Sequence, residues 1–166
     1  MNEVKQKISI ITAALACLLC VFMLSGCAND NQNAEADDPT VISPGQSLTI
    51  PADAISEVVA FFPAVVDDTY MEIIAFEAAD GTLRTALNTC ENCHASGNGY
   101  YEQDADAVIC QQCNMRFALI DIGLQPGGCQ PIPISEEDRN IINGAVEITY
   151  EVLSENTHWF ANWKPE

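Results

Sequence analysis

Five cysteines in the second half of the chain form the pattern with the clearest chemistry. They comprise two C-x-x-C pairs, Cys90 with Cys93 and Cys110 with Cys113, and a fifth residue, Cys129, in the arrangement C-x2-C-x16-C-x2-C-x15-C. Two pairs separated by 16 residues fall in the range in which four thiolates bind one tetrahedral ion, because each pair lies on a tight turn that directs two sulfurs to one point. The spacing of the two pairs predicts a metal site of four thiolates, and Cys129 adds a fifth cysteine to the constellation.

The residues next to these cysteines are suited to tight turns. Asn114 and His94 directly follow the two pairs, and we expect both to adopt the left-handed backbone conformation, which Asn and His tolerate better than bulkier residues. Gly127-Gly128 precedes Cys129, and paired glycines let backbone N–H groups approach a ligand or an anionic sulfur closely. Between the pairs, Tyr100-Tyr101 is expected to shield the site.

Several kinds of centre are compatible with these cysteines. Four thiolates alone do not choose between zinc and an iron–sulfur cluster. The run from Cys90 to His94 also spells the attachment signature of c-type haem, with His94 as the candidate axial ligand, but one haem would leave the other three cysteines unexplained. Disulfides are a further alternative, although five cysteines cannot all pair within one chain.

Hydrolase and transferase activities find no support in the sequence. It contains no recognisable Ser/His/Asp set, phosphate-binding loop or pair of carboxylates at catalytic spacing. We therefore do not predict an enzyme, and we expect the cysteine site to serve metal binding or electron transfer.

The elements expected to position the cysteines are mainly strands. Residues 72–76 (EIIAF) and 82–86 (TLRTA) flank Asp80-Gly81, a strong hairpin signal. Residues 145–152 (AVEITYEV) alternate with period two, which predicts a strand. Weaker strand candidates are 47–50, 117–120 and 58–65, the last with Pro63 marking an edge or bulge.

Helix is expected to be scarce. Residues 135–138 (SEED) resemble a capping box that opens a short helix ending at Asn143. Residues 153–163 are expected to hold a terminal turn that packs Trp159 and Phe160 onto the sheet. The predicted fold is therefore mainly β, a small α+β domain of β-hairpins with two C-x-x-C knuckles, a Gly-Gly-Cys loop and few short helices.

The N-terminus has the features of a lipoprotein signal peptide. Two lysines precede an apolar run over residues 8–24, which is short for a spanning helix, although an uncleaved anchor helix is the alternative. Leu24-Ser25-Gly26-Cys27 resembles a lipobox, so we expect residues 1–26 to be removed and Cys27 to carry the lipid. The predicted protein is then anchored to the cell membrane on its extracytoplasmic side, through an acidic flexible tether over residues 27–40, with a single domain over 41–166.

The charge of the chain excludes some partners. It contains 24 acidic and 6 basic residues, for a formal net charge of −18. Such a chain is repelled by phosphates, so we expect neither nucleic acid nor anionic lipid head groups to bind it through a basic patch.

The run from about Phe76 to Ile134 resembles the FtrD-like family of membrane iron–sulfur proteins. The shared motifs are DGTLRTALNTCENC, GYY, VICQQC, IG and GGCQPIPI. Members of that family are predicted to bind an iron–sulfur centre through these cysteines, and some serve ferrous-iron uptake systems beside a permease and periplasmic iron or copper proteins. Larger members have many membrane spans, whereas this chain has a predicted lipid anchor in their place.

The resemblance implies a membrane-tethered, extracytoplasmic metal-binding protein that holds an iron–sulfur centre. Its role would be electron transfer, or an accessory function in iron or metal uptake beside a membrane transport or redox complex. The alternatives are a zinc ribbon that only organises an interaction surface and, further, a c-type haem protein.

Overall fold

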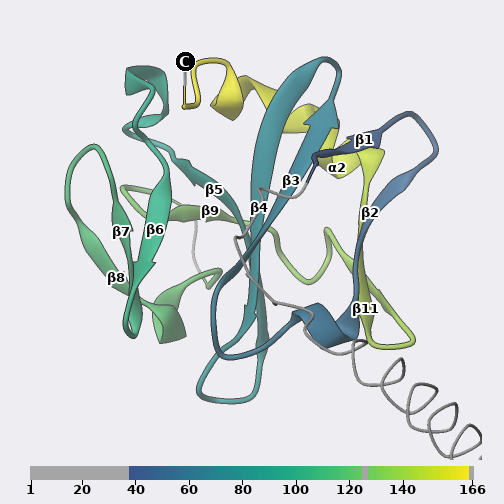
Figure 1. The fold of residues 1–166 in the computed structure, drawn as a ribbon, viewed down its shortest axis with the longest axis horizontal. Helices are drawn as coiled ribbons and strands as arrows, with labels where there is room; N and C mark the ends of the chain where they lie inside the picture. Colours follow the sequence, from purple (N-terminus) through teal and green to yellow (C-terminus); the bar gives the residue numbers. More distant parts are fainter. Residues whose placement is uncertain (1–37, 125–126, 165–166) are drawn as a thin grey trace, which may run out of the picture. The chain divides into compact units, whose positions relative to one another are not determined.

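Strands dominate the computed structural model, which describes residues 38–124 and 127–164 (Figure 1). The strands are β1 (Thr40–Ile42), β2 (Ser47–Ile50), β3 (Ala60–Val66), β4 (Thr69–Glu77), β5 (Leu83–Cys90), β6 (Tyr101–Asp104), β7 (Ala107–Cys110), β8 (Arg116–Ala118), β9 (Pro131–Pro133), β10 (Asn140–Ile142) and β11 (Ala145–Thr149). The helical segments are α2 (Tyr150–Glu155) and the 3-10 turns η2 (Ala52–Ala54), η3 (His94–Ser96), η4 (Leu119–Asp121) and η5 (Thr157–Phe160). The predicted mainly β fold class is confirmed.

The strands form one five-stranded sheet and two three-stranded sheets. The five-stranded sheet has the order β1-β3-β4-β5-β9, and the smaller sheets have the orders β10-β11-β2 and β6-β7-β8. All described pairings are antiparallel except that of β1 with β3. In Figure 1 the long strands β3 and β4 lie between the sheet β6-β7-β8 and the segment containing β2, β11 and α2.

Both faces of β4 and β5 are buried, and this gives the domain two hydrophobic cores. Ile73, Ala75 and Leu87 point into a core shared with β2, β11, α2 and η5. Ile74, Phe76 and Ala86 point to the opposite face and pack with Cys90, Tyr101, Val108 and Cys110. Alternate side chains of a strand face opposite sides, so a strand that is buried on both faces is apolar at every position. Residues 73–76 of β4 form such a continuous apolar run. The second core contains the cysteines.

The predicted hairpin over residues 72–86 is confirmed. Strands β4 and β5 pair in antiparallel register from Ile73↔Leu87 to Glu77↔Leu83. The turn contains Gly81 at φ 77°, a conformation that glycine adopts without steric cost. The Asp80 carboxylate accepts a hydrogen bond from the Thr82 amide at 3.0 Å.

Strand β3 matches the prediction of an edge near Pro63. Proline cannot donate a ladder hydrogen bond, so it is tolerated only where one side of the strand is unpaired. Pro63 pairs with Glu72 of β4, whereas β1 on the other side covers only Ala64 to Val66. The strand over residues 47–50 is also confirmed, as β2.

The strand predicted over residues 145–152 is correct only for its first half. Strand β11 ends at Thr149, whose partner Ser47 is the first residue of β2. Beyond that point no neighbouring strand remains, and Tyr150 begins α2. Its hydroxyl donates to the Asp67 carboxylate at 2.7 Å, and Leu153 is fully buried, so the helical turn is fixed by tertiary contacts that the alternating pattern does not reveal.

The helix predicted over residues 135–143 is wrong. The Ser135 hydroxyl donates to the Asp138 carboxylate at 2.6 Å, which closes a turn instead of capping a helix. Arg139 then donates to the carbonyl of Leu83 at 3.0 Å and fixes the chain to β5. The following residues pair with β11 as strand β10.

The structure shortens one further predicted strand, and the N-terminal prediction stays untested. The strand expected over residues 117–120 is β8, which ends at Ala118 and continues as η4. The predicted signal peptide and the predicted lipid-bearing Cys27 lie outside the described residues. Among the residues that are described, none of the helices combines the length and the apolar character that crossing a membrane requires.

Candidate metal centre

Cys90 lies at the point where three segments of the chain meet. It is the last residue of β5 and pairs with Pro131 of β9, across a register shift between Leu87 and Cys90. Because Cys129 is two residues before Pro131, this pairing brings the Gly-Gly-Cys loop to the end of β5. The Cys90 amide also donates to the carbonyl of Gly99 at 2.7 Å, which places the start of β6 beside it.

The side chain of Asn88 connects the sheet that carries Cys90 to the sheet that carries Cys110. Asn88 is fully buried; its carbonyl oxygen accepts from the Tyr101 amide at 2.8 Å, and its amide donates to the Tyr101 carbonyl at 3.3 Å. Tyr101 in turn pairs with Cys110 across β6 and β7. Asn88 therefore sets the spacing between the two cysteine pairs, a role that the sequence pattern did not indicate.

The first knuckle, Cys90 to Cys93, is a tight turn held by backbone hydrogen bonds. The Cys93 amide donates to the Cys90 carbonyl at 3.1 Å. Gly99 packs directly on this turn, since a Cβ added there would lie 2.5 Å from the carbonyl carbon of Cys93. Only glycine fits at that position.

The predicted left-handed conformation is confirmed at Asn114 and wrong at His94. Asn114 has φ 58°, and its amide donates to the Cys110 carbonyl at 2.9 Å, which closes the second knuckle. His94 instead begins η3, and the left-handed residue is Gly97 at φ 88°. Glycine takes that conformation more readily than histidine, so the turn extends until it reaches one.

Cys129 is presented by a loop that requires both of its glycines. Gly127 and Gly128 have φ 105° and 76°, values that L-residues with side chains rarely adopt. The sulfur of Cys129 accepts a hydrogen bond from the Asn92 side chain at 3.6 Å. Its carbonyl accepts one from the Tyr101 hydroxyl, so the loop is tied to both the first knuckle and β6.

The structure brings all five predicted cysteines together. Their sulfurs fall into two sets, Cys90 with Cys93 and Cys129, and Cys93 with Cys110 and Cys113, and within each set all sulfurs lie within 4.8 Å of one another. All five are free thiols. Thiolates at this proximity are the donor set expected for zinc, copper(I) or iron–sulfur centres, so the residues fit a metal cofactor.

Burial controls the acidity of the thiols on the inner side of the site. Cys90 and Cys110 are fully buried. Removal from water, partly offset by backbone N–H groups of the second knuckle, raises the pKa of Cys110 to about 11. Burial and the contact with Cys90 raise the pKa of Cys93 far above its usual range. These thiols lose their protons when a cation replaces them.

The outer thiols behave differently from each other. Burial acts to raise the pKa of Cys113, but hydrogen bonds from the Met115 amide and neighbouring thiols outweigh it, and the pKa of Cys113 is lowered. The Asn92 hydrogen bond acts to lower the pKa of Cys129, but burial and the Cys113 thiol raise it above its usual value. Cys113 is also the exposed member of the five, which makes it the most accessible thiolate.

Of the two tyrosines expected to shield the site, only Tyr101 does so. It is 1% exposed and belongs to the same core as Cys90 and Cys110, and burial raises its pKa far above the usual range. Tyr100 faces away, with its ring 5.9 Å from that of Trp163 and 4.3 Å from the Lys164 ammonium.

The C-terminal segment fastens the first knuckle to the domain. The Trp163 indole donates to the Asn88 carbonyl at 2.7 Å, and the Lys164 amide donates to the Gly97 carbonyl at 2.9 Å. The ring of His94 packs edge-on against Trp159, with centroids 4.9 Å apart. As predicted, Phe160 is buried in the first core, but the contact of Trp159 with the cysteine knuckle was not foreseen.

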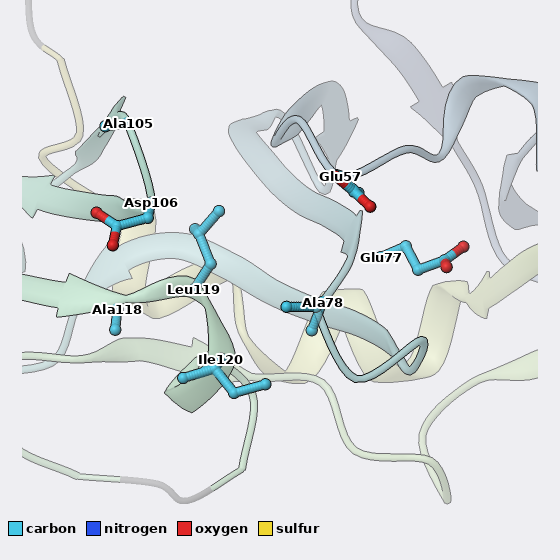
Figure 2. Close-up of a pocket in the computed structure, with 9 residues that line it drawn as sticks. Glu57, Glu77, Ala78, Ala105, Asp106, Ala118, Leu119 and Ile120 are labelled. Atoms are coloured by element: carbon cyan, nitrogen blue, oxygen red, sulfur yellow. The ribbon is translucent and has the colours of Figure 1, made fainter.

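A separate cavity of about 460 Å³ lies at the opposite end of β7 from Cys110. It contains none of the five cysteines and is lined by Glu57, Glu77, Ala78, Ala79, Ala105, Asp106, Ala118, Leu119 and Ile120. Figure 2 shows Leu119, Ile120 and Ala78 in the middle, with Asp106 on one side and Glu57 and Glu77 on the other. Asp106 pairs with Arg116 at 3.1 Å, and the groups of described side chains close enough to hold a metal ion are the two cysteine sets, so we assign no metal site to this cavity.

Comparison with known proteins gives one match. The family model described as "Membrane iron-sulfur containing protein FtrD-like" matches residues 55–160. This range contains all five cysteines, Asn88, Gly99 and Tyr101. No curated protein and no solved structure matches the chain.

Proposed function

Because this chain belongs to the FtrD-like family of membrane iron–sulfur-containing proteins, we propose that it is a membrane-tethered electron-transfer module with an iron–sulfur centre. Cys90, Cys93, Cys110, Cys113 and Cys129 supply the thiolate ligands. When bound, the centre supplies one-electron redox chemistry, and its potential depends on hydrogen bonding and solvent exposure at the sulfurs.

One observation carries the proposal: five free thiols from three separate segments converge in two sets of three that share Cys93, and the sulfurs of each set lie within 4.8 Å of one another. Deprotonation of five closely packed thiols without cations is costly, because the thiolates repel one another and the inner ones are desolvated. A bound metal centre offsets that cost, and we assign the convergence to metal binding for this reason.

A redox role is favoured over a purely structural zinc ribbon by Cys129 and Cys113. A structural zinc site is complete with four thiolates and leaves no open coordination position. Here the Cys129 sulfur groups with Cys90 and Cys93, so the fifth thiol belongs to the site. Cys113 is exposed, which gives a redox partner access to the edge of the centre.

The haem alternative has less support. Attachment of haem to Cys90 and Cys93 would need both sulfurs at an open face, but Cys90 is fully buried. A ring nitrogen of His94 lies 2.7 Å from the Glu91 carbonyl oxygen, and the ring packs against Trp159. Ligation through Nε2 would leave the Nδ1 contact in place, so the burial of Cys90 is the observation that disfavours haem.

For the location we propose the extracytoplasmic side of the cell membrane, through a lipid on Cys27. The motif that ends at Cys27 supports this. Lipobox chemistry requires the Cys27 thiol, so Cys27→Ser leaves an unprocessed or soluble protein. Detergent-phase partitioning and the mass of the mature chain test it, and a Ser variant that stays in the detergent phase at an unchanged mass contradicts it.

We propose a membrane metal-transport or redox complex as the partner, with a role in iron uptake. The family description places related proteins in membranes with iron–sulfur centres. The net charge of −18 favours a neutral or basic docking surface and disfavours nucleic acid.

The proposed cofactor is tested by purification of the full chain from membranes without air. Iron and acid-labile sulfide in the protein, together with a visible absorption band that Cys90→Ser abolishes, are the expected result. A colourless protein that holds one zinc ion, with unchanged zinc content in Cys129→Ala, would leave the structural ribbon in its place.

A further inference from the structure

The sulfurs of the candidate centre form two overlapping sets, not one. Cys90, Cys93 and Cys129 make one set, and Cys93, Cys110 and Cys113 make the other. Tetrahedral bonds of about 2.3 Å to a single zinc ion would place all four ligand sulfurs about 3.8 Å apart. Among the described residues, the sets that satisfy a 4.8 Å limit contain three cysteines each, so the five sulfurs spread wider than the ligands of one ion.

Cys93 is the member that both sets share, and the chain places it there in two steps. In the turn that begins at Cys90, the Cys93 amide donates to the Cys90 carbonyl at 3.1 Å. This hydrogen bond keeps the two sulfurs of the first knuckle together. The hydrogen bonds of Asn88 with Tyr101 then bring the second knuckle alongside. Cys93 is thus held between the loop of Cys129 on one side and the pair Cys110 and Cys113 on the other.

The charge of five thiolates also favours two cations. The four basic side chains of the described residues are engaged elsewhere: Arg84 with Asp80, Arg116 with Asp104 and Asp106, Arg139 with Thr85 and the carbonyls of Leu83 and Ile134, and Lys164 with the rings of Tyr100 and Trp163. Positive charge at the site must therefore come from metal. One divalent ion would leave an excess of about three negative charges in a partly buried site, whereas two leave about one.

We propose that the five cysteines hold two metal ions side by side, one in each set of three sulfurs, with the thiolate of Cys93 shared between them. The inference rests on the proposed metal-binding function but not on its redox role. It names the ligand class as thiophilic ions, because sites made of thiolates alone select soft metals. Cys129 then has a defined task, since without it one of the two sets is reduced to two sulfurs.

The test counts cadmium ions, a thiophilic probe, in the full chain loaded without air. Native mass spectrometry is expected to show two cadmium ions per chain, and cadmium NMR to show two signals. Cys129→Ala and Cys113→Ala should each retain one ion, and each should lose a different one of the two signals. Cys93→Ala should bind neither ion when a weak chelator competes.

The variants of Cys113 and Cys129 keep the test independent of folding, because neither side chain is part of the fully buried core. One cadmium ion in the wild type, or two in Cys129→Ala, overturns the shared-thiolate arrangement while leaving metal binding intact. A wild type that binds no cadmium overturns the proposed metal-binding function together with it.

Discussion

The side chain of Asn88 forms two hydrogen bonds with the backbone of Tyr101: its oxygen accepts from the Tyr101 amide at 2.8 Å, and its NH2 group donates to the Tyr101 carbonyl at 3.3 Å. These two bonds take the place of backbone hydrogen bonds between β5 and β6, which belong to different sheets. Because Tyr101 pairs with Cys110 and Asn88 precedes Cys90 by two residues, this contact fixes the distance between the two cysteine pairs.

Removal of this contact should loosen the centre as well as the fold. Asn88→Ala leaves the buried amide and carbonyl of Tyr101 without partners, and such a loss costs about 1–3 kcal/mol. We expect a lower free energy of unfolding in denaturant and weaker metal retention against a chelator. Asn98→Ala is the matched control, since Asn98 is exposed. Equal stability and equal metal retention in the two variants would contradict the role of Asn88.

Gly99 is predicted to be irreplaceable for steric reasons. A Cβ at this position would lie 2.5 Å and 2.6 Å from the carbonyl carbon and oxygen of Cys93, so the first knuckle must move. Overpacking of this kind costs about 1–3 kcal/mol, and Gly99→Ala should lower both Tm and metal content. The control is Gly45→Ala, where φ is +82° but nothing lies within 4 Å; it should lower Tm while metal content stays unchanged. Full metal occupancy in Gly99→Ala would show that the knuckle does not depend on this packing.

The stability of the metal-free protein should fall at alkaline pH. Cys110 has an ordinary pKa of 9.0 in the unfolded chain, and burial raises it to about 11 in the fold. Between these values the unfolded chain has released the proton and the folded chain still binds it, so the free energy of unfolding decreases as pH rises. Below pH 9 this contribution is fully present. Urea titrations of metal-free protein from pH 8 to about 11 measure it, and a midpoint that rises over this window would be inconsistent with the burial of Cys110.

Thiol reactivity in the metal-free protein should begin at Cys113. Its pKa is lowered, whereas burial raises that of Cys110 and Cys93, and the thiolate is the nucleophile. Brief treatment with iodoacetamide at neutral pH, followed by peptide mass spectrometry, should find Cys113 modified several-fold faster than the other four. Metal loading should suppress the reaction. Preferential labelling of Cys110 would contradict the described burial of the site.

Local patterns in the sequence were sufficient for the elements that depend on short-range chemistry. The Asp80-Gly81 turn, the strand over residues 72–76 and the edge at Pro63 follow from backbone sterics and the density of apolar residues. The spacing of the cysteines likewise predicted that they would gather, because each C-x-x-C turn orients its own two sulfurs.

Elements that depend on partners distant in the chain could not be predicted in this way. The alternation of residues 145–152 continues past Thr149, but β2 offers no residue beyond Ser47 to pair with it. Ser135 and Asp138 form a hydrogen bond that closes a turn. The same residue types at the same spacing also occur in a capping box, so the sequence does not distinguish the two. The hydrogen bonds between Asn88 and Tyr101 and between Trp163 and Asn88 join residues that are 13 and 75 positions apart. A single sequence carries no local signal for contacts at such separations.

A redox titration of the protein purified without air tests the central claim most directly. Absorbance is followed while the potential is swept over the range of iron–sulfur centres, about −700 to +450 mV. We expect a reversible change that is absent in Cys90→Ser and shifted in Cys129→Ala, because that substitution removes a sulfur from the centre and the hydrogen bond that it accepts from Asn92. A wild-type protein with its metal bound and no reversible change anywhere in this range would contradict an electron-transfer centre.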